Sequence, residues 1–474
     1  MSSFGGLSIA GSGLSAARAA LEVTGQNVAN ANTEGYTRQR VDLAPMAQTA
    51  LATFSKPTGN GDGVVVTGVS RMNDTVVDAR VNSTASAAAY WSTTADAVST
   101  VETSLNEPST SGLASQLNTF WNDWQVVANN AGGTAASGAA NQLIQQGGLV
   151  ASTISAGYDA ASNAWTAARA AAASTTTTIN STAANIVDLN KTIRSLSAAG
   201  GNVNSLLDQR DAAVTTLAKL TGATTRGNAD GTIDVVVGGN TLVSGVTSRA
   251  VQLGGAQQFS DVAAGAGLSL VWSDSPTTSV SLDGGEMAAR IASLQPAADS
   301  GTGGVFAEAA QAYNGIAKSV ADAVNALHTT GFTSTGQTGL KFFDYGSDDT
   351  AASSLKVVAT SAADIATAAK DKGANDATNA DAIAQLGSGT ASPNLAWSAY
   401  VARVGTQSAT AAARSTTAAT ASTAATTAQS SVSGVDLDEE TSNLVLFQHA
   451  YQASARVIST INDVLDTLIN MGAR

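Results

Sequence analysis

The stretch NVANANTEGYTRQRVDL, residues 27–43, is where the chain changes from one kind of structure to another. A helical pattern leads into it, and a strand-like pattern follows it. Residues 27–33 are mostly Asn, Ala and Thr, small side chains that let a helix end among close neighbours, and asparagine accepts cap and left-handed geometry. Gly35 permits a turn that a side chain disfavours. Tyr36 and Arg38 then offer an aromatic face and a cation. The stretch therefore predicts a joint between a helix and an extended segment.

The helical pattern before the joint has a seven-residue repeat, and the end of the chain has the same repeat. Near the N-terminus one row is Leu7, Leu14, Leu21 and Val28, and the row three residues later is Ala10, Ala17, Thr24 and Ala31. Near the C-terminus the rows are Leu437, Leu444, Tyr451, Ile458 and Leu465, and then Phe447, Ser454, Ile461 and Leu468. Such rows form the seam of a coiled coil. Residues 1–32 and 434–474 are therefore predicted to form a terminal coiled-coil domain.

Asp436 is the predicted start of the C-terminal helix. It follows a break at Ser433-Gly434, and Glu439 stands three residues later, as in a capping box. Together with Asp438 and Glu440, Glu439 places negative charge at the positive end of the helix dipole. A pair of catalytic carboxylates is the alternative interpretation of these residues, and we favour the cap.

Helices with a β-rich insert fill the region between the two ends. Helical periodicity covers residues 75–105, 112–129, 139–197, 204–220, 285–294, 304–328 and 393–429. The low-complexity run at 171–180 is interpreted as an exposed turn of helix, with a linker as the alternative. Apolar alternation between Gly and Asp turns predicts strands within 222–283, and the segment that begins at Leu355 is predicted to be a strand that returns to them.

The fold class predicted from this layout is mainly α with a β-rich insert, arranged as an elongated rod. Residues 33–74 are expected to form an extended linker with short strands and a turn at 59–63. The remaining predicted units are a discontinuous helical-bundle rod domain, 75–221, 284–330 and 393–433, and a small β-rich outer domain, 222–283 and 331–392.

Composition and charge argue against several classes of protein. The chain has 23 Lys and Arg against 36 Asp and Glu, and its net charge of −13 opposes binding to nucleic acids and to anionic membrane surfaces. It has no cysteine, which excludes disulfides and thiolate chemistry. The N-terminus lacks the pattern of a cleaved signal peptide, and the longest uncharged run lacks large apolar residues, so no membrane insertion is expected.

Motifs for catalysis or metal binding are absent from the sequence. His328 is interpreted as a favourable cation at a helix C-terminus and His449 as an outward-facing residue, and neither has a metal-ligand partner at a suitable spacing. Phosphate-binding and hydrolase motifs do not occur. The prediction is a protein that is not an enzyme and has no cofactor. Four tryptophans, Trp91, Trp121, Trp124 and Trp165, are interpreted as core anchors, with a ligand-stacking platform as the alternative.

The joint resembles the N-terminal signature of the axial proteins of bacterial flagella. Its matching residues are Asn27, Ala29, Asn30, Thr33, Gly35, Tyr36 and Arg38. Residues 433–472 resemble the C-terminus of the flagellar hook-associated protein 1 family, and LLDQRDAAV at 206–214 is similar to the central helical domain of that family. The span between Phe342 and Pro393 is too short for the further outer domain that better-known members carry, so a reduced outer surface is expected.

The resemblance implies a structural role at the first junction zone between hook and filament. It implies as partners the hook protein, the third hook-associated protein, other copies of this chain, and a cytoplasmic export chaperone that covers the C-terminal heptads. It also implies export without a cleaved signal through the flagellar type III channel, and localisation outside the cell. The sixteen residues expected at subunit interfaces are the two large heptad rows with Phe447, Ile461 and Leu468, together with Asn30, Gly35, Tyr36 and Arg38.

Two other functions are compatible with parts of the sequence. Another axial component of hook or distal-rod type would share the joint but lack the long helical middle. The other alternative is a secreted surface adhesin or enzyme, and a hydrolase would need a nucleophile or metal constellation that the sequence does not contain. A helix with an exposed apolar seam is marginal in water. The terminal helices are therefore expected to be mostly disordered in the monomer and to become ordered on assembly.

Overall fold

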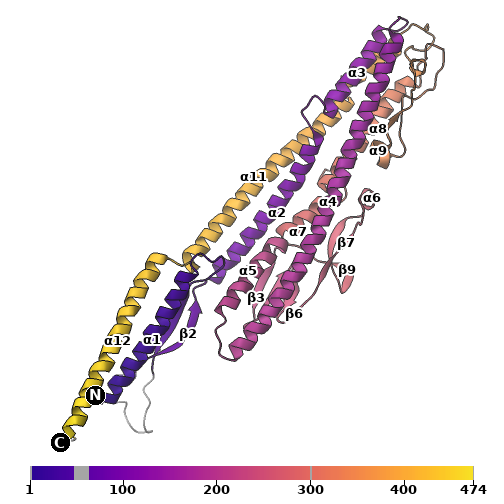
Figure 1. Ribbon diagram of the computed structural model, residues 1–474. Coiled ribbons are helices and arrows are strands. Elements are labelled where there is room, and N and C mark those ends of the chain that lie inside the picture. Colours follow the sequence, from indigo (N-terminus) through magenta and orange to yellow (C-terminus); the bar gives the residue numbers. More distant parts are fainter. Residues whose placement is uncertain (1–2, 47–62, 299–300, 473–474) are drawn as a thin grey trace.

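The computed structural model describes residues 3–46, 63–298 and 301–472. Figure 1 shows an elongated molecule in which the first and last helices lie together at one end, and a rod of long helices extends from them. The helix pair is α1, Ser3–Ala29, with α12, Leu437–Gly472. The mainly α, elongated fold class is confirmed.

A β-hairpin follows α1 and packs beside it. β1, Gln39–Pro45, pairs antiparallel with β2, Val64–Arg71, with a register shift between Asp42 and Leu43. The strand predicted after the joint is therefore confirmed. The turn predicted at 59–63 lies, apart from Gly63, outside the described residues.

The rod is built from helices whose ends agree with the sequence periodicity to within a few residues. They are α2 Thr75–Leu105, α3 Leu113–Asn129, α4 Ala136–Ala198, α5 Asn204–Thr221, α7 Gly285–Ser293, α8 Val305–His328 and α11 Pro393–Ser433. Helices α2 and α11 lie along each other from the joint towards the far end (Figure 1). α4 has 63 residues and runs the length of the rod, about 95 Å at 1.5 Å per residue.

The low-complexity run at 171–180 belongs to α4, as predicted. Its predicted exposure holds for one face only, on which Ala173, Ser174, Thr177 and Thr178 are exposed. Ala172, Thr175, Thr176 and Ile179 are buried. The Thr175 hydroxyl also donates a hydrogen bond to the Glu286 carboxylate of α7 at 3.0 Å. Small side chains on this face of α4 allow α7 and the β-sheets to approach closely, which the composition of the run did not reveal.

Two small antiparallel sheets pack against the C-terminal half of α4. The first contains β3 Thr224–Gly227, β4 Ile233–Val237, β5 Asn240–Ser244 and β6 Thr247–Ser248, in that order. The second contains β7 Val251–Gly255, β8 Leu268–Trp272 and β9 Ser275–Ser279, with α6 Phe259–Ala263 between β7 and β8. The Asn190 side chain of α4 fixes the first sheet by donating to the carbonyls of Ile233 and Gly245.

Residues 331–392 form short elements beside α3, α4 and α8. They are β10 Phe343–Asp344, η1 Asp348–Thr350, α9 Ala351–Ser354, β11 Lys356–Val357, η2 Ala362–Asp364, α10 Thr378–Ala384 and η3 Gln385–Gly387. The prediction that the strand after Leu355 returns to the first β segment is wrong, because β11 pairs with β10. Its side chains pack on α4, where a Cβ at Gly147 would lie 3.0 Å from Val357.

Aromatic side chains fill the core between the small residues of the rod helices. Trp124 and Trp165 are fully buried and Trp121 is 5% exposed, so the core interpretation is confirmed for these three. Trp91 differs because it is only partly buried and lines a surface groove beneath Arg414, with the guanidinium 4.6 Å from the ring centre.

His328 does not act as the cation that the sequence predicted. Its ring is buried, its Nε2 accepts a hydrogen bond from the Ala366 N–H at 3.0 Å, and its Nδ1 lies 2.7 Å from the Leu340 carbonyl oxygen. These partners require neutral imidazole with the proton on Nδ1. Burial also lowers the pKa of His328. His449 is exposed on α12, as expected.

Candidate functional site

The joint after α1 is a turn that glycine makes possible. α1 ends at Ala29, and Gly35 has a φ of +78°, the left-handed value that the sequence indicated. Between them, the Asn30 side chain donates to the Gln26 carbonyl at 3.0 Å and accepts from the Thr33 hydroxyl at 3.3 Å. These local hydrogen bonds end the helix and direct the chain into β1.

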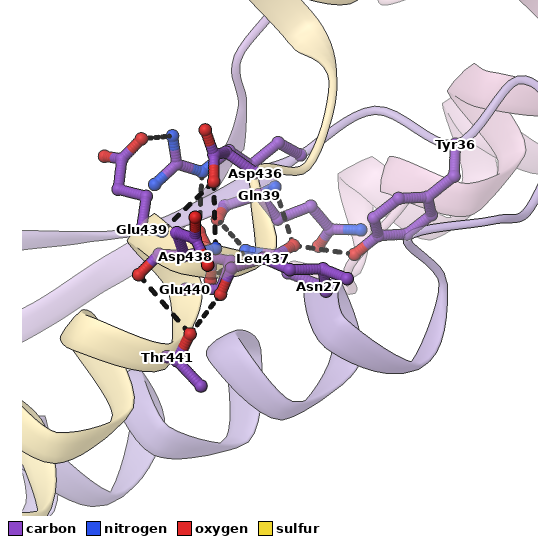
Figure 2. A network of polar contacts seen from close by, with 10 residues as sticks. Asn27, Tyr36, Gln39, Asp436, Leu437, Asp438, Glu439, Glu440 and Thr441 are labelled. Atoms are coloured by element: carbon purple, nitrogen blue, oxygen red, sulfur yellow. Dashed lines mark hydrogen bonds and ion pairs between the residues drawn. The ribbon is translucent and has the colours of Figure 1, made fainter.

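Asn27 connects the three chain segments that meet at the joint (Figure 2). It is 1% exposed. Its Oδ1 accepts from the Tyr36 hydroxyl at 2.9 Å and from the Gln39 N–H at 3.0 Å. Its Nδ2 donates to the Gln39 carbonyl at 2.9 Å and to the Glu440 carboxylate at 3.1 Å. One side-chain amide therefore holds the end of α1, the extended segment and the start of α12.

Arg38 forms the ionic part of the same joint. Its Nε lies 2.7 Å from Glu440 Oε1 and its Nη1 lies 2.9 Å from Glu439 Oε2. The Glu440 side chain is 2% exposed and the Glu439 side chain 57% exposed, so the pair with Glu440 is the less solvated one. The Arg38 N–H also donates to the Ser433 carbonyl at the end of α11. Arg38 thus ties the extended segment to both C-terminal helices.

The acidic residues at the start of α12 have two different roles, capping the helix and binding Arg38. Asp436 is the cap, as predicted, because its Oδ1 accepts from the N–H groups of Asp438 and Glu439 at 2.9 and 3.2 Å. The Glu439 side chain, expected to complete a capping box, bonds to Arg38 instead. Sequence reasoning missed the role of Glu440. Its signal was an acidic residue in the heptad row of Phe447 and Ile461, where an apolar residue is expected.

A second set of contacts fixes the joint to the rod. Arg71 Nε lies 3.0 Å from Asp208 Oδ1 on α5, and Asp208 Oδ2 accepts from the Thr37 N–H at 3.3 Å. The Asn204 side chain donates to Gln39 Oε1 at 3.1 Å and to the Val69 carbonyl at 2.9 Å. Asp208 lies in the LLDQRDAAV segment, residues 206–214, so this segment and the neighbouring Asn204 anchor the hairpin to α5.

Electrostatics at the joint favour the observed charge states. Burial raises the pKa of Tyr36, and the carboxylates of Asp208 and Glu440 raise it further, so the hydroxyl stays protonated as a donor. The hydrogen bond from Arg38 lowers the pKa of Glu439. Within the described residues no cluster of three or more His, Asp or Glu side chains has the arrangement of a metal site. The arrangement suits mechanical connection of segments.

Helices α1 and α12 approach each other through glycine. A Cβ at Gly6 would lie 3.2 Å from Ile461, and a Cβ at Gly13 would lie 3.2 Å from the Ser454 hydroxyl. With the Asn27–Glu440 hydrogen bond, these contacts define an antiparallel pair in one continuous register. Small residues at seven-residue spacing let the two backbones come close.

The predicted interface residues on α1 and α12 lie at different depths in this pair. Leu7, Leu14 and Leu21 are partly buried, Val28 is 39% exposed, and the buried positions of α1 are mostly small side chains such as Ala10, Ala17 and Ala20. On α12, Leu444, Phe447, Ile458, Ile461 and Leu465 are partly buried. Leu437, Tyr451 and Leu468 are 50%, 38% and 55% exposed. Glycine and alanine occupy the positions of α1 that face α12 directly, so the row of Leu7, Leu14, Leu21 and Val28 lies beside that contact.

An apolar stripe on α12 remains uncovered in the single chain. It consists of Leu446, Val457, Val464, Leu468 and Met471, which are 48–71% exposed. At 100° per residue they lie within about 60° of arc, roughly a quarter turn from the face that contacts α1. Such a continuous apolar face marks an interaction site. We call it the α12 stripe. Of its five residues only Leu468 was predicted from the sequence, because the prediction followed the heptad seam.

The chain matches three protein-family models, all of them flagellar. Residues 98–343 match the "Flagellar hook-associated protein FlgK helical domain". Residues 7–37 match "Flagella basal body rod protein", and residues 428–471 match "Flagellar basal body rod FlgEFG protein C-terminal". The two terminal matches contain most of α1 and α12 and part of the joint.

Curated relatives and a solved structure agree with the family models. The chain is 31% identical to flagellar hook-associated protein 1 of Bacillus subtilis, over 99% of this chain and 98% of the relative. It is 26% identical to that of Escherichia coli, over 97% and 98%. That alignment spans 576 residues, more than the 474 of this chain, so the relative carries insertions. The flagellar hook junction protein from Burkholderia pseudomallei shares the fold, with a TM-score of 0.59, 18% identity, and coverage of 75% of this chain and 100% of that one.

Proposed function

This chain belongs to the flagellar hook-associated protein 1 (FlgK) family, and we propose that it connects axial subunits through the α1–α12 pair and the α12 stripe. Its role as a structural component of the axis at the hook–filament junction follows from the family. The observation that carries the proposed mechanism is the stripe itself, because an isolated chain leaves it in water.

Burial of the α12 stripe supplies a driving force for assembly. Covering one side chain of this size stabilises by roughly 1.5–3 kcal/mol when burial goes from fully exposed to complete. The five stripe residues start from partial exposure, so each contributes a fraction of that value. Neighbouring copies of this chain have the same helix and can cover one stripe with the next. The sixteen residues expected at interfaces, from Leu7 to Leu468, belong to this proposed contact region.

The joint transmits mechanical force from the α1–α12 pair to the helices of the rod. Arg38 binds both α12 and the end of α11, and Asp208 and Asn204 hold the hairpin to α5. The Gly35 turn sets the direction in which the chain leaves α1. A pull on α1 and α12 therefore reaches the rod through several parallel hydrogen bonds and ion pairs.

Several partners belong to the same proposal. Association with hook and other axial components follows from the family, and we assign the hook protein to one side and the third hook-associated protein to the other. A cytoplasmic chaperone would cover α12 before export, since its exposed apolar stripe would otherwise associate. Export is proposed to proceed unfolded and without a cleaved signal. No catalytic, nucleic-acid-binding or membrane-inserted role is proposed, and no described helix is long and apolar enough to span a bilayer.

The domain division is proposed from the same architecture. The terminal domain comprises 1–32 and 434–474, followed by the linker 33–74, the rod of 75–221, 284–330 and 393–433, and outer parts at 222–283 and 331–392. Support comes from the separate pairing of the two small sheets and of β10 with β11. Limited proteolysis of the purified chain tests the division, with first cuts expected in 33–74 and near 434. First cuts inside α4 would contradict it.

Polar replacement within the α12 stripe tests the proposed function. The double variant Val457→Asp, Val464→Asp is expressed in a deletion strain of the host, and the matched control is Gln452→Asp, Ser459→Asp on the opposite face of α12. We expect cells of the stripe variant to export it, to carry hooks without filaments, and to release flagellin into the medium. Cells of the control should build filaments. Normal filaments on cells with the stripe variant would refute the proposal.

Ordering on assembly is the second proposed property of the terminal pair. The glycine-lined seam buries little area per residue, so the pair alone has little stability. We expect weak amide-exchange protection across residues 7–28 and 437–468 in the purified monomer, and strong protection in assembled junctions. Strong protection of both stretches in the monomer would contradict this property.

A further inference from the structure

A groove lies on the rod where α2, α7, α8 and α11 meet, away from the terminal pair. It has a volume of about 510 Å³. Its walls include Trp91 of α2 and Arg403 and Arg414 of α11. We call it the two-arginine groove. Trp91 and Arg414 come from α2 and α11, the two helices that run along each other in Figure 1.

The charge in the two-arginine groove is opposite to that of the chain. Arg414 is exposed, stacks on Trp91 and forms no ion pair within the described ranges. Arg403 stacks on Tyr400, with its guanidinium 5.2 Å from the ring centre, and lies 3.5 Å from Glu308. Glu308 is the acid of the groove lining. Its Oε1 is already occupied by the N–H groups of Ala298 and Gly303. The groove therefore has spare positive charge in a chain of net charge −13.

A second hollow continues the groove along α11. It has a volume of about 490 Å³ and lies between α8 and α11, with Gly315 and Ala396 in its lining. Tyr400 and Arg403 belong to both hollows. Tyr400 is 8% exposed, and its hydroxyl has no hydrogen-bond partner among the described residues. From Ala396 to Arg414 the two hollows follow α11 for about 27 Å at 1.5 Å per residue. That length suits a polypeptide segment better than a small molecule.

We propose that the two-arginine groove and its continuation seat a carboxylate-bearing segment of a second copy of this chain. The inference rests on the proposed function, because copies joined through their terminal helices bring their rods side by side. The excess of acidic residues lies mostly outside the rod helices. The outer parts, residues 222–283 and 331–392, carry 12 Asp and Glu against 6 Lys and Arg, and so offer carboxylates to a neighbouring copy. Arg414 and Arg403 pair with such carboxylates, and the Gly315–Ala396 hollow receives an apolar side chain of the same segment. This contact places a lateral bond between neighbouring copies at a distance from the terminal pair.

Photocrosslinking in assembled flagella tests the contact. The full-length chain carries Gln407→p-benzoylphenylalanine in the groove lining. We expect ultraviolet light to give a product at twice the 47.0 kDa monomer mass. Adding Arg414→Glu should reduce this product at least tenfold, whereas Arg414→Lys should retain most of it. Arg80→Glu, an equal charge change on exposed α2 surface outside the groove, should leave it unchanged.

Two further crosslinker positions separate failure of this contact from failure of the proposed function. Ala412→p-benzoylphenylalanine lies outside the groove lining and should give little dimer. Val464→p-benzoylphenylalanine in the α12 stripe should crosslink to another copy whenever the chain has assembled. Dimer from Val464 with none from Gln407, or a Gln407 product with a different protein, overturns the groove contact and leaves the function intact. Absence of dimer from both positions in assembled flagella overturns both.

Discussion

Gly157→Ala should destabilise the rod, although it places a better helix former in the middle of α4. Gly157 is buried, and a Cβ there would lie 2.1 Å from Cζ and 2.6 Å from the hydroxyl oxygen of Tyr313 on α8. Real atoms cannot approach so closely, so either the ring or the α8 backbone has to move. Tyr313 is 3% exposed and its ring lies 5.1 Å from that of Trp397 on α11. The contact therefore links three helices of the rod.

The expected loss is about 2–4 kcal/mol. Alanine gains about 1 kcal/mol over glycine in helix propensity. Overpacking of a filled core costs about 1–3 kcal/mol, and complete loss of a buried aromatic contact approaches 3–5 kcal/mol. The 2.1 Å approach places the cost between the upper end of the overpacking range and complete loss of the aromatic contact, about 3–5 kcal/mol, so about 2–4 kcal/mol remains after the propensity gain is subtracted. A change of 2–4 kcal/mol alters the folding equilibrium by roughly 30- to 700-fold.

The matched control is Gly148→Ala in the same helix. Gly148 is exposed, and a Cβ there would meet nothing within 4 Å. This variant should stabilise by about 0.5–1 kcal/mol. Urea unfolding of the full chain, followed by tryptophan fluorescence, should move the midpoint in opposite directions for the two variants. Stabilisation by Gly157→Ala equal to that by Gly148→Ala would refute the packing argument.

Three more predictions concern the joint, the seam and the buried histidine. Glu440→Gln should lower the amide-exchange protection of the Gln39 N–H in assembled junctions by about 2–3 kcal/mol. Glu439→Gln should lower it by less than about 1 kcal/mol, because the Glu439 carboxylate is exposed. Equal effects of the two variants would contradict the assignment of Glu440 as the buried partner of Arg38. Gly13→Leu should prevent α1 from approaching Ser454 of α12 and abolish filament growth. Cells with Gly11→Leu, where a Cβ would meet nothing within 4 Å, should still grow filaments. Equal filament lengths by microscopy would contradict the close α1–α12 contact at Gly13. Burial lowers the folded pKa of His328, so its contribution to stability is present above the unfolded pKa of about 6.5 and is lost as the pH falls below it. Urea midpoints from pH 7 to 5 should fall less steeply for His328→Gln than for the natural chain, and parallel curves would exclude this role.

Local patterns in the sequence determined the elements and the position of the joint. Helix periodicity located α2, α3 and α4 to within a few residues, because such patterns express burial of one helix face. Asp436 was recognisable as a cap and Gly35 as a left-handed turn, because both depend on the backbone of their own neighbourhood. The helix-to-extended change at residues 27–43 required no knowledge of distant residues.

Tertiary structure alone decided which surfaces meet. The Arg38–Glu440 pair joins residues 402 positions apart, and no local pattern connects them. The repeat identified a seam on α1 but not that Gly6 and Gly13 lie directly against α12, since leucine and glycine rows are both periodic. Trp124 and Trp91 have similar helical surroundings in sequence, yet one is buried and the other lines a groove. Periodicity specifies the face that a helix buries, whereas its partner depends on how closely two backbones can approach, and that is fixed only when distant segments pack together.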